Sequence, residues 1–407
     1  MTAGRRIRRR LRSFTLAWVL GALALRLAAA QGTASNGALP VVPQEIVLQQ
    51  QVLPYELESV YWNIDRTNTP FLKEPELSQQ GVFRGVLRFD KTDTHNAIAL
   101  IWDPPKGKLY LDLNRNLDLT DDPAGVFSST NKRPQQIFTH VTLPIQSAAG
   151  LHPAILDLRL VPSGAGRQMQ AQLSSRSMWQ AKVEVAGEEW QVAVVDDLLR
   201  QDGPSAAQFL LLRPWAARTN HLSLRDYNTG IVRFPDRLFW LGQAFHLERR
   251  FDTQGETLVC KLGLTPEQPP LTELKLSGES LYYVGLRATN GYTVVWWEPS
   301  GMLKVPQGIY SVSAVWLKKG GAEAYRLANE LLRLNATAPT NVVLGGPLTN
   351  AVTLTRQGRK LRMDYRLVGA DGGSYRLAQQ DRNKVPEFAV YHGARKDAVE
   401  SGKFEFG

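Results

Sequence analysis

The chain has 407 residues, and 43% of them are hydrophobic, which is enough for two or three domains with cores of their own and argues against a disordered protein. The formal net charge is +10, but seven of the basic residues are arginines within the first 30 residues, where no acidic residue occurs. The rest of the chain therefore carries only +3. A charge this small excludes the broad basic surface expected of a nucleic-acid-binding protein.

The first 30 residues have the pattern of a secretory signal peptide. Six arginines between residues 5 and 12 precede an apolar run at 14–25, and three alanines at 28–30 provide small residues for cleavage. The apolar run is shorter than the roughly 20 residues that a spanning helix needs, and Arg26 interrupts it. We therefore expect a signal peptide at 1–30, a linker at 31–44, no transmembrane segment after the leader is removed, and a secreted or extracytoplasmic location (periplasm, cell surface or extracellular).

Most of the remaining chain alternates between apolar and polar residues with the period of β-strands. Residues 179–185 and 190–194 form such a pair around Gly187, which predicts an antiparallel hairpin. The segments 309–316 and 361–367 alternate in the same way. The composition of 323–334 favours a helix, whereas 332–337 would serve equally as a strand. These patterns predict a mainly β fold of two to three antiparallel β-sandwich or partly open barrel domains.

Proline-rich residues 264–270 mark the clearest expected domain boundary, because such a segment cannot pair as a central strand. A second boundary is expected near residue 150. The predicted domains are 45–150, 151–266 and 267–407, the last an immunoglobulin-like sandwich. The strand that runs into Asp196 and Asp197 is either a degenerate repeat of the first domain or a chance acidic turn.

Oxygen-bearing side chains recur at every second position after the strand-like residues 108–113. Alternate residues of a tightly curled loop can all turn their oxygens inward, and a hard cation such as Ca²⁺ needs six to eight of them. Leu119 occupies the place of an apolar anchor. The predicted metal ligands are Asp112, Asn114, Asn116, Asp118, Thr120 and Asp122, with Asp121 as a substitute for the last.

Two departures from a regular calcium loop predict weak binding. Leu117 stands where glycine usually permits the turn, and Pro123 stands where a bidentate carboxylate usually closes the site. Dissociation constants of roughly 10⁻⁴ to 10⁻³ M would follow, as in extracellular modules. The alternative is an Asx-rich turn without metal, in which side chains bond the backbone two residues on. No helix is expected on either side, so this is not a helix-loop-helix EF-hand.

The loop resembles the Asp/Asn-rich calcium loops of dockerin-like repeats in secreted bacterial proteins, over about a dozen residues. The chain as a whole is similar in style to uncharacterised secreted bacterial multi-domain β proteins. The features that carry this resemblance are residues 111–122, Val195-Asp196-Asp197, 305–310 and 401–407. The resemblance implies export and β architecture, but no reaction.

Motifs of hydrolases and phosphate-binding loops do not occur in the sequence. Asp90, Asp93 and His95 lie close together and could contribute to a metal or acid/base site, although such stretches usually form solvated turns. Cys260 is the single cysteine, so no intrachain disulfide can form, and its alternating surroundings predict a buried thiol.

Trp296 and Trp297 are the candidate for sugar stacking. Neighbouring strand residues point to opposite faces, so one tryptophan should lie in the core while the other is exposed or covered by a neighbouring domain. We expect a non-catalytic structural or adhesive protein with a weak calcium site. The alternatives are a polysaccharide-binding module and an extracellular hydrolase, and the candidate partners are surface polysaccharide or another extracellular protein.

Overall fold

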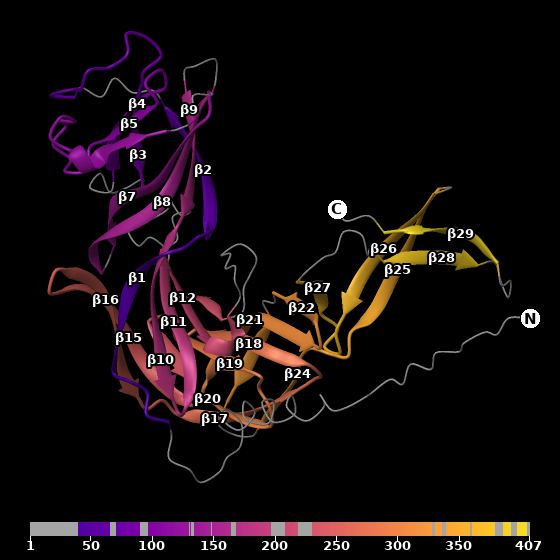
Figure 1. The fold of residues 1–407 in the computed structure, drawn as a ribbon. Coiled ribbons are helices and arrows are strands. Elements are labelled where there is room, and N and C mark those ends of the chain that lie inside the picture. Colours follow the sequence, from indigo (N-terminus) through magenta and orange to yellow (C-terminus); the bar gives the residue numbers. More distant parts are fainter. Residues whose placement is uncertain are drawn as a thin grey trace, which may run out of the picture.

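The computed structural model describes residues 40–65, 71–89, 97–129, 131, 134–147, 149–163, 168–196, 208–218, 230–327, 330–335, 339–358, 360–378, 386–391 and 397–404. Regular structure in these ranges is almost entirely strand, with two single-turn 3-10 helices, η2 (Pro123–Gly125) and η4 (Trp215–Ala217) (Figure 1). The predicted mainly β fold is therefore confirmed. Within the described ranges, no helix has the length and apolarity needed to span a membrane.

Residues 58–175 form a unit with a core of its own between two four-stranded sheets. Large buried side chains such as Trp102 and Phe138 fill this core. The first sheet has the order β2 (Glu58–Asp65), β9 (Gln168–Ser175), β8 (Gly150–Ser163) and β7 (Gln136–Ser147). The second has the order β3 (Phe83–Arg88), β4 (Ala97–Asp103), β5 (Lys108–Leu111) and β6 (Val126–Ser128).

This unit is an insertion between two strands that pair with each other. β1 (Glu45–Val52) enters it and β10 (Ser177–Val185) leaves it, and the two are antiparallel neighbours in another sheet. The expected boundary near residue 150 falls in the turn between β7 and β8, which pair along their length and share one core. The place of β1 depends on its partners β10 and β16, which are distant in sequence, and local patterns do not reveal such pairing.

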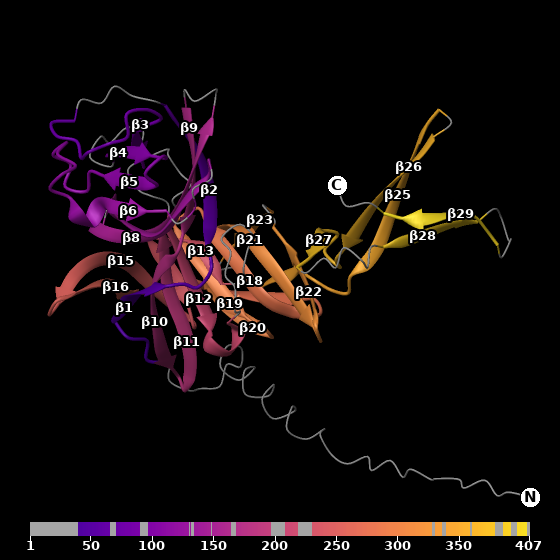
Figure 2. The same cartoon turned by 45° about the horizontal axis from the view of Figure 1, so that its top comes forward.

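The rest of the described chain is organised around a long, 16-stranded sheet (Figures 1 and 2). Its order is β13 (Ile231–Arg233), β12 (Gln208–Pro214), β11 (Glu188–Asp196), β10, β1, β16 (Thr257–Glu267), β15 (Gln243–Gln254), β14 (Arg237–Trp240), β19 (Tyr292–Trp297), β18 (Leu281–Ala288), β21 (Gly308–Lys319), β22 (Ala322–Arg326), β27 (Ser374–Leu377), β26 (Lys360–Val368) and β25 (Thr349–Gln357), with β23 (Leu331–Leu334) also paired to β21. Two smaller sheets complete the fold: β20 (Met302–Pro306), β17 (Leu271–Ser277) and β24 (Thr340–Val343), and the pair β28 (Glu387–Tyr391) and β29 (Ala398–Lys403).

The expected boundary at 264–270 lies where β16 ends and β17 begins, yet the long sheet continues across it. Pro266 belongs to β16 and pairs with Phe245, beyond the point at which β1 covers the other edge of that strand. A proline is tolerated there because no ladder bond to a second neighbour is needed. The pairs β14–β19 and β17–β24 are parallel, so the sheets are not purely antiparallel as predicted.

The C-terminal part packs as two layers, with the β20–β17–β24 sheet against the long sheet. Leu274 and Val305 of the small sheet share a buried cluster with Leu286, Val294 and Val312 of the long sheet. This arrangement fits the predicted sandwich, and its immunoglobulin-like topology stays a prediction.

Several local predictions are confirmed. The hairpin of β10 and β11 pairs Trp179 with Val194. The segment left open between helix and strand is strand where it is regular, in β22 (Ala322–Arg326) and β23 (Leu331–Leu334). Cys260 is fully buried, and burial raises the pKa of its thiol to about 12. The predicted linker is partly packed, because Val42 belongs to a core cluster.

Candidate functional site

The Asp/Asn-rich loop follows β5 and is held together by its own side chains. Asp112 is buried, and its two carboxylate oxygens accept hydrogen bonds from the backbone N–H groups of Asn116 and Leu117, each at 3.1 Å. The side-chain oxygens of Asn114, Asn116 and Asp118 each accept a bond from the N–H two residues on, at 3.1, 2.7 and 2.9 Å. These are successive Asx turns, which were expected if the run held no metal.

The backbone curls at two residues in the left-handed conformation. Arg115 has φ 62° and Leu117 has φ 64°. The turn that a glycine would normally permit is therefore formed by Leu117, at a steric cost of about 1 kcal/mol or more. The predicted apolar anchor is confirmed, since Leu119 is buried against Ile101 and Tyr110.

The carboxylates on the exposed side of the loop accept hydrogen bonds from amide groups, and one of them pairs with a lysine. Asp121 accepts bonds from the Nδ2 atoms of Asn114 and Asn116, at 3.1 and 2.7 Å. Asp118 accepts bonds from the hydroxyl and N–H of Thr120, and its Oδ2 lies 3.1 Å from Lys73 Nζ. These contacts, with those of Thr120 first, lower the pKa of Asp118.

Asp122 is turned toward the protein interior. Its Oδ2 accepts a bond from the N–H of Leu113 at 3.1 Å, and the residue is buried. Burial raises the pKa of the Asp122 carboxyl group, and the nearby carboxylates of Asp112 and Asp121 add to the increase.

The loop offers the oxygen donors that a hard cation prefers, but they already have partners. Four carboxylates and two amides lie within residues 112–122. The amide nitrogens of Asn114 and Asn116 face Asp121, so both amides would have to turn before their oxygens could bind a cation there. Lys73 would compete at Asp118. The residues therefore fit calcium only as a weak site, and the described residues contain no group of three or more His, Cys, Asp or Glu that could hold a metal ion.

A cavity of about 630 Å³ lies beside the loop, between it and the β7–β8 hairpin. Its walls are mostly apolar, and the loop contributes the polar atoms of Asn114 and Asp122. The lining residues are Leu113, Asn114, Asp122, Ala124, Phe127, Thr142, Pro144, Leu151, His152, Pro153 and Leu258. The inserted unit and β16 of the long sheet therefore meet at this cavity.

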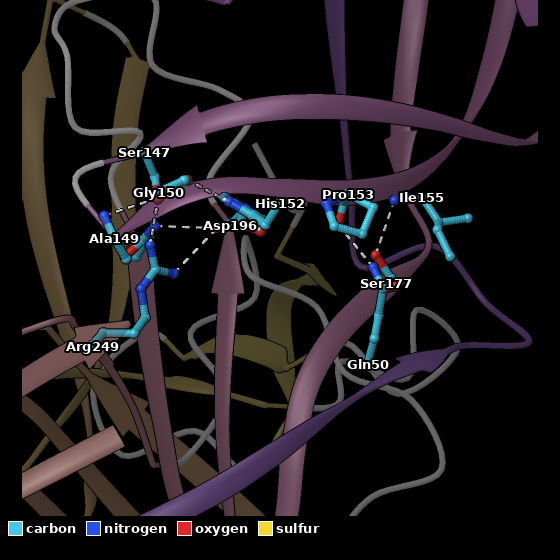
Figure 3. Close-up of polar contacts among 11 residues, drawn as sticks. Gln50, Ser147, Ala149, Gly150, His152, Pro153, Ile155, Ser177, Asp196 and Arg249 are labelled. Atoms are coloured by element: carbon cyan, nitrogen blue, oxygen red, sulfur yellow. Dashed lines mark hydrogen bonds and ion pairs between the residues drawn. The ribbon is translucent and has the colours of Figure 1, made fainter. Parts of the chain in front are cut away.

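A buried cluster of polar and charged side chains adjoins the cavity through His152, which also lines it; Figure 3 shows the contacts of this cluster. Nε2 of His152 in β8 lies 3.0 Å from Oδ2 of Asp196 at the end of β11, and Nδ1 lies 3.3 Å from the carbonyl oxygen of Gly150. Arg249 in β15 places its Nη1 3.5 Å from Oδ1 of Asp196. Burial would raise the pKa of Asp196, but His152 and Arg249 together hold it below the ordinary value.

The same cluster fastens the inserted unit to the long sheet. Arg249 donates through Nη2 to the Ser147 hydroxyl at 2.9 Å, and the N–H of Phe251 donates to the carbonyl oxygen of Ala149 at 3.4 Å. The ring of Phe251 stacks on His152 with centroids 4.3 Å apart. The β7–β8 turn is thus a contact between the two units.

The remaining sequence candidates do not form a site in the described residues. Asp90, Asp93 and His95 lie outside them. Trp296 and Trp297 point into two different cores, with exposed fractions of 5% and 2%. The predicted opposite orientation is confirmed, and the second tryptophan is covered rather than exposed. Neither ring can stack on a sugar.

Sequence reasoning missed the cluster of His152, Asp196 and Arg249. Asp196 was noted only as an acidic residue after a strand, and His152 had no motif around it. The three residues are brought together by strands of two different sheets. The single local signal is an acidic residue directly after the apolar run 192–195 of β11.

Comparison with known proteins yields no relative: no family model, no curated protein and no solved structure matches the chain.

Proposed function

We propose that this chain is an exported, non-catalytic β protein with a structural or adhesive role at the cell surface or outside the cell, and that weak calcium binding at residues 112–122 stabilises its inserted unit. The observation that carries the proposal is the loop itself, in which Asp112 fixes two left-handed turns and four carboxylates are gathered within eleven positions. Export is inferred from the leader pattern at 1–30 alone.

Electrostatic repulsion supports a role for a cation. Burial is the largest cause of the raised pKa of Asp122, and the carboxylates of Asp112 and Asp121 add to the increase. A divalent ion would relieve this repulsion if the amides of Asn114 and Asn116 turned their oxygens inward. That rearrangement has a free-energy cost, so millimolar affinity is expected, in the range of extracellular modules.

Candidate partners are a surface polysaccharide or another extracellular protein. The cavity beside the loop supports a binding role, because Asn114 and Asp122 contribute both to the loop and to the cavity wall. Calcium and a bound group would then be coupled. The buried tryptophan pair gives no support to sugar binding by stacking. The hydrolase alternative stays a hypothesis, because its candidate residues Asp90, Asp93 and His95 lie outside the described part of the chain.

The test is thermal unfolding of residues 31–407 at increasing millimolar CaCl₂, with MgCl₂ as the ion control. At a calcium concentration 100 times the dissociation constant, the folded state gains about 2.7 kcal/mol. The stabilisation should disappear in Asp121→Asn, which removes an exposed carboxylate without disturbing the buried Asp112. Glu273→Gln, on the exposed face of β17, is the matched control and should keep it. Two results would show that the loop is an Asx turn without metal. One is an equal calcium-induced rise of the unfolding midpoint in wild type and both variants, and the other is no rise in wild type.

A further inference from the structure

The hairpin of β25 and β26 projects from the body of the molecule in both views (Figures 1 and 2). β26 pairs with β27 only through Leu367 and Val368, at the base of the hairpin. In the described residues, the outer edge of β25 has no partner strand. A two-stranded ribbon is only marginally stable by itself in water. Apolar side chains that stay exposed on it therefore suggest that the ribbon contacts another surface.

One face of the hairpin is mostly apolar and carries Arg356 near the turn. The register pairs Val352 with Tyr365, Leu354 with Met363, and Arg356 with Leu361, and residues directly opposite each other share a face. Near the base, the ring of Tyr365 is covered by Phe404, with centroids 5.3 Å apart.

The distal half of that face is open. Val352, Leu354 and Leu361 are 47%, 60% and 51% exposed. Single exposed apolar side chains are ordinary, but three neighbouring ones on a projecting ribbon mark a contact surface.

The hairpin also concentrates the positive charge of the protein. Residues 349–368 contain five basic residues and one acidic residue, a net charge of +4, whereas residues 31–407 together carry +3. Arg356, Lys360 and Arg362 are all exposed and lie within a few residues of the turn. Arg356 shares the face of Leu354 and Leu361, whereas Lys360 and Arg362 flank Leu361 on the opposite face, and Arg362 also lies 3.0 Å from Asp364.

We propose that the end of the β25–β26 hairpin docks on an anionic lipid surface, with Leu354 and Leu361 entering the acyl boundary and Arg356, Lys360 and Arg362 contacting the headgroups. A second copy of the chain is disfavoured, because two ends of equal positive charge would repel each other. A purely ionic polymer would satisfy the cations and leave the leucines in water. A bilayer interface is the one surface that offers both chemistries in the required order.

The experiment measures sedimentation of residues 31–407 with vesicles. The leader is omitted because its arginines would themselves bind lipid, and the core residues of the described part begin at Val42. The protein should bind vesicles of equal parts phosphatidylglycerol and phosphatidylcholine, and not pure phosphatidylcholine. Each cation contributes about fivefold, so Arg356→Gln, Lys360→Gln and Arg362→Gln together should lower the partition coefficient on the order of 100-fold.

Two further variants separate the lipid proposal from its rivals. Arg287→Gln, Lys304→Gln and Arg333→Gln together remove the same charge from other exposed strand positions and should leave binding nearly unchanged. Leu354→Ser with Leu361→Ser should weaken vesicle binding while leaving the midpoint of thermal unfolding unchanged, because both side chains are exposed.

Four results would overturn the proposal. The first two concern wild type: equal binding to neutral and anionic vesicles, or no binding to either. The third is an equal loss of vesicle binding in the two triple charge variants. The fourth is binding to heparin that is as tight as binding to vesicles and is unaffected by the leucine substitutions. Concentration-dependent dimerisation abolished by the leucine substitutions would instead identify a second copy as the occupant.

Discussion

His152 and Asp196 face each other at 3.0 Å from β8 and β11, strands of different sheets, and both side chains are buried. Because Arg249 contacts the same carboxylate, the inserted unit and the long sheet share one charged cluster. A buried carboxylate with two basic partners is costly to disrupt, since each partner would be left without compensation.

Asp196→Asn should therefore reduce the free energy of unfolding by about 3–5 kcal/mol, because it leaves the buried Arg249 guanidinium without its counter-charge. Urea denaturation followed by tryptophan fluorescence measures the loss. Asp252→Asn removes an ion pair with Lys261 in which the carboxylate is solvent-exposed, and it should cost much less than Asp196→Asn. Equal costs in the two variants would contradict this account of the cluster.

The Asp196 carboxylate should also make the free energy of unfolding depend on pH in the acidic range. The pKa of Asp196 is lower in the folded protein than its ordinary value of 3.8, so its contribution is fully present above that value and is lost as the pH falls through the folded pKa. Unfolding free energies measured between pH 6 and pH 2.5 should fall more steeply for wild type than for Asp196→Asn. Parallel curves would show that Asp196 is not held ionised.

The two adjacent tryptophans of β19 should both be required for stability. Trp296→Ala and Trp297→Ala each open a cavity in a different core, and each should cost about 3–5 kcal/mol. Chemical denaturation gives both values, and Tyr61→Ala, at a residue that is 60% exposed, should change stability by about 0.5 kcal/mol or less. A cost near zero for either tryptophan would mean that its ring is exposed after all.

Leu117→Gly should stabilise the calcium-free protein by about 0.5–1 kcal/mol, because glycine adopts the left-handed conformation without the steric cost borne by leucine. Thermal unfolding in the presence of a chelator measures this change. Leu113→Gly is the matched control: its φ is not positive and its side chain lines the cavity, so it should destabilise the protein. A loss of stability in Leu117→Gly would show that side-chain packing outweighs backbone strain there.

The loop shows how far local sequence reaches. Every oxygen in its Asx turns bonds a backbone group within five residues, and Leu119 alternates into the core as its strand-like spacing predicts. Whether the Asn114 amide turns its oxygen or its nitrogen toward Asp121 is not a local property, since it depends on what neutralises that carboxylate.

The sequence by itself determined the β class, the hairpin of β10 and β11, the buried Cys260 and the opposite orientations of Trp296 and Trp297, because a period of two fixes which side chains share a face. Only the tertiary structure decided that β1 pairs with β10 and β16 around an inserted unit, that both tryptophans are covered, and that His152 meets Asp196. These outcomes depend on pairing between strands far apart in the chain, where the partner's position, and not local alternation, determines which surface is buried.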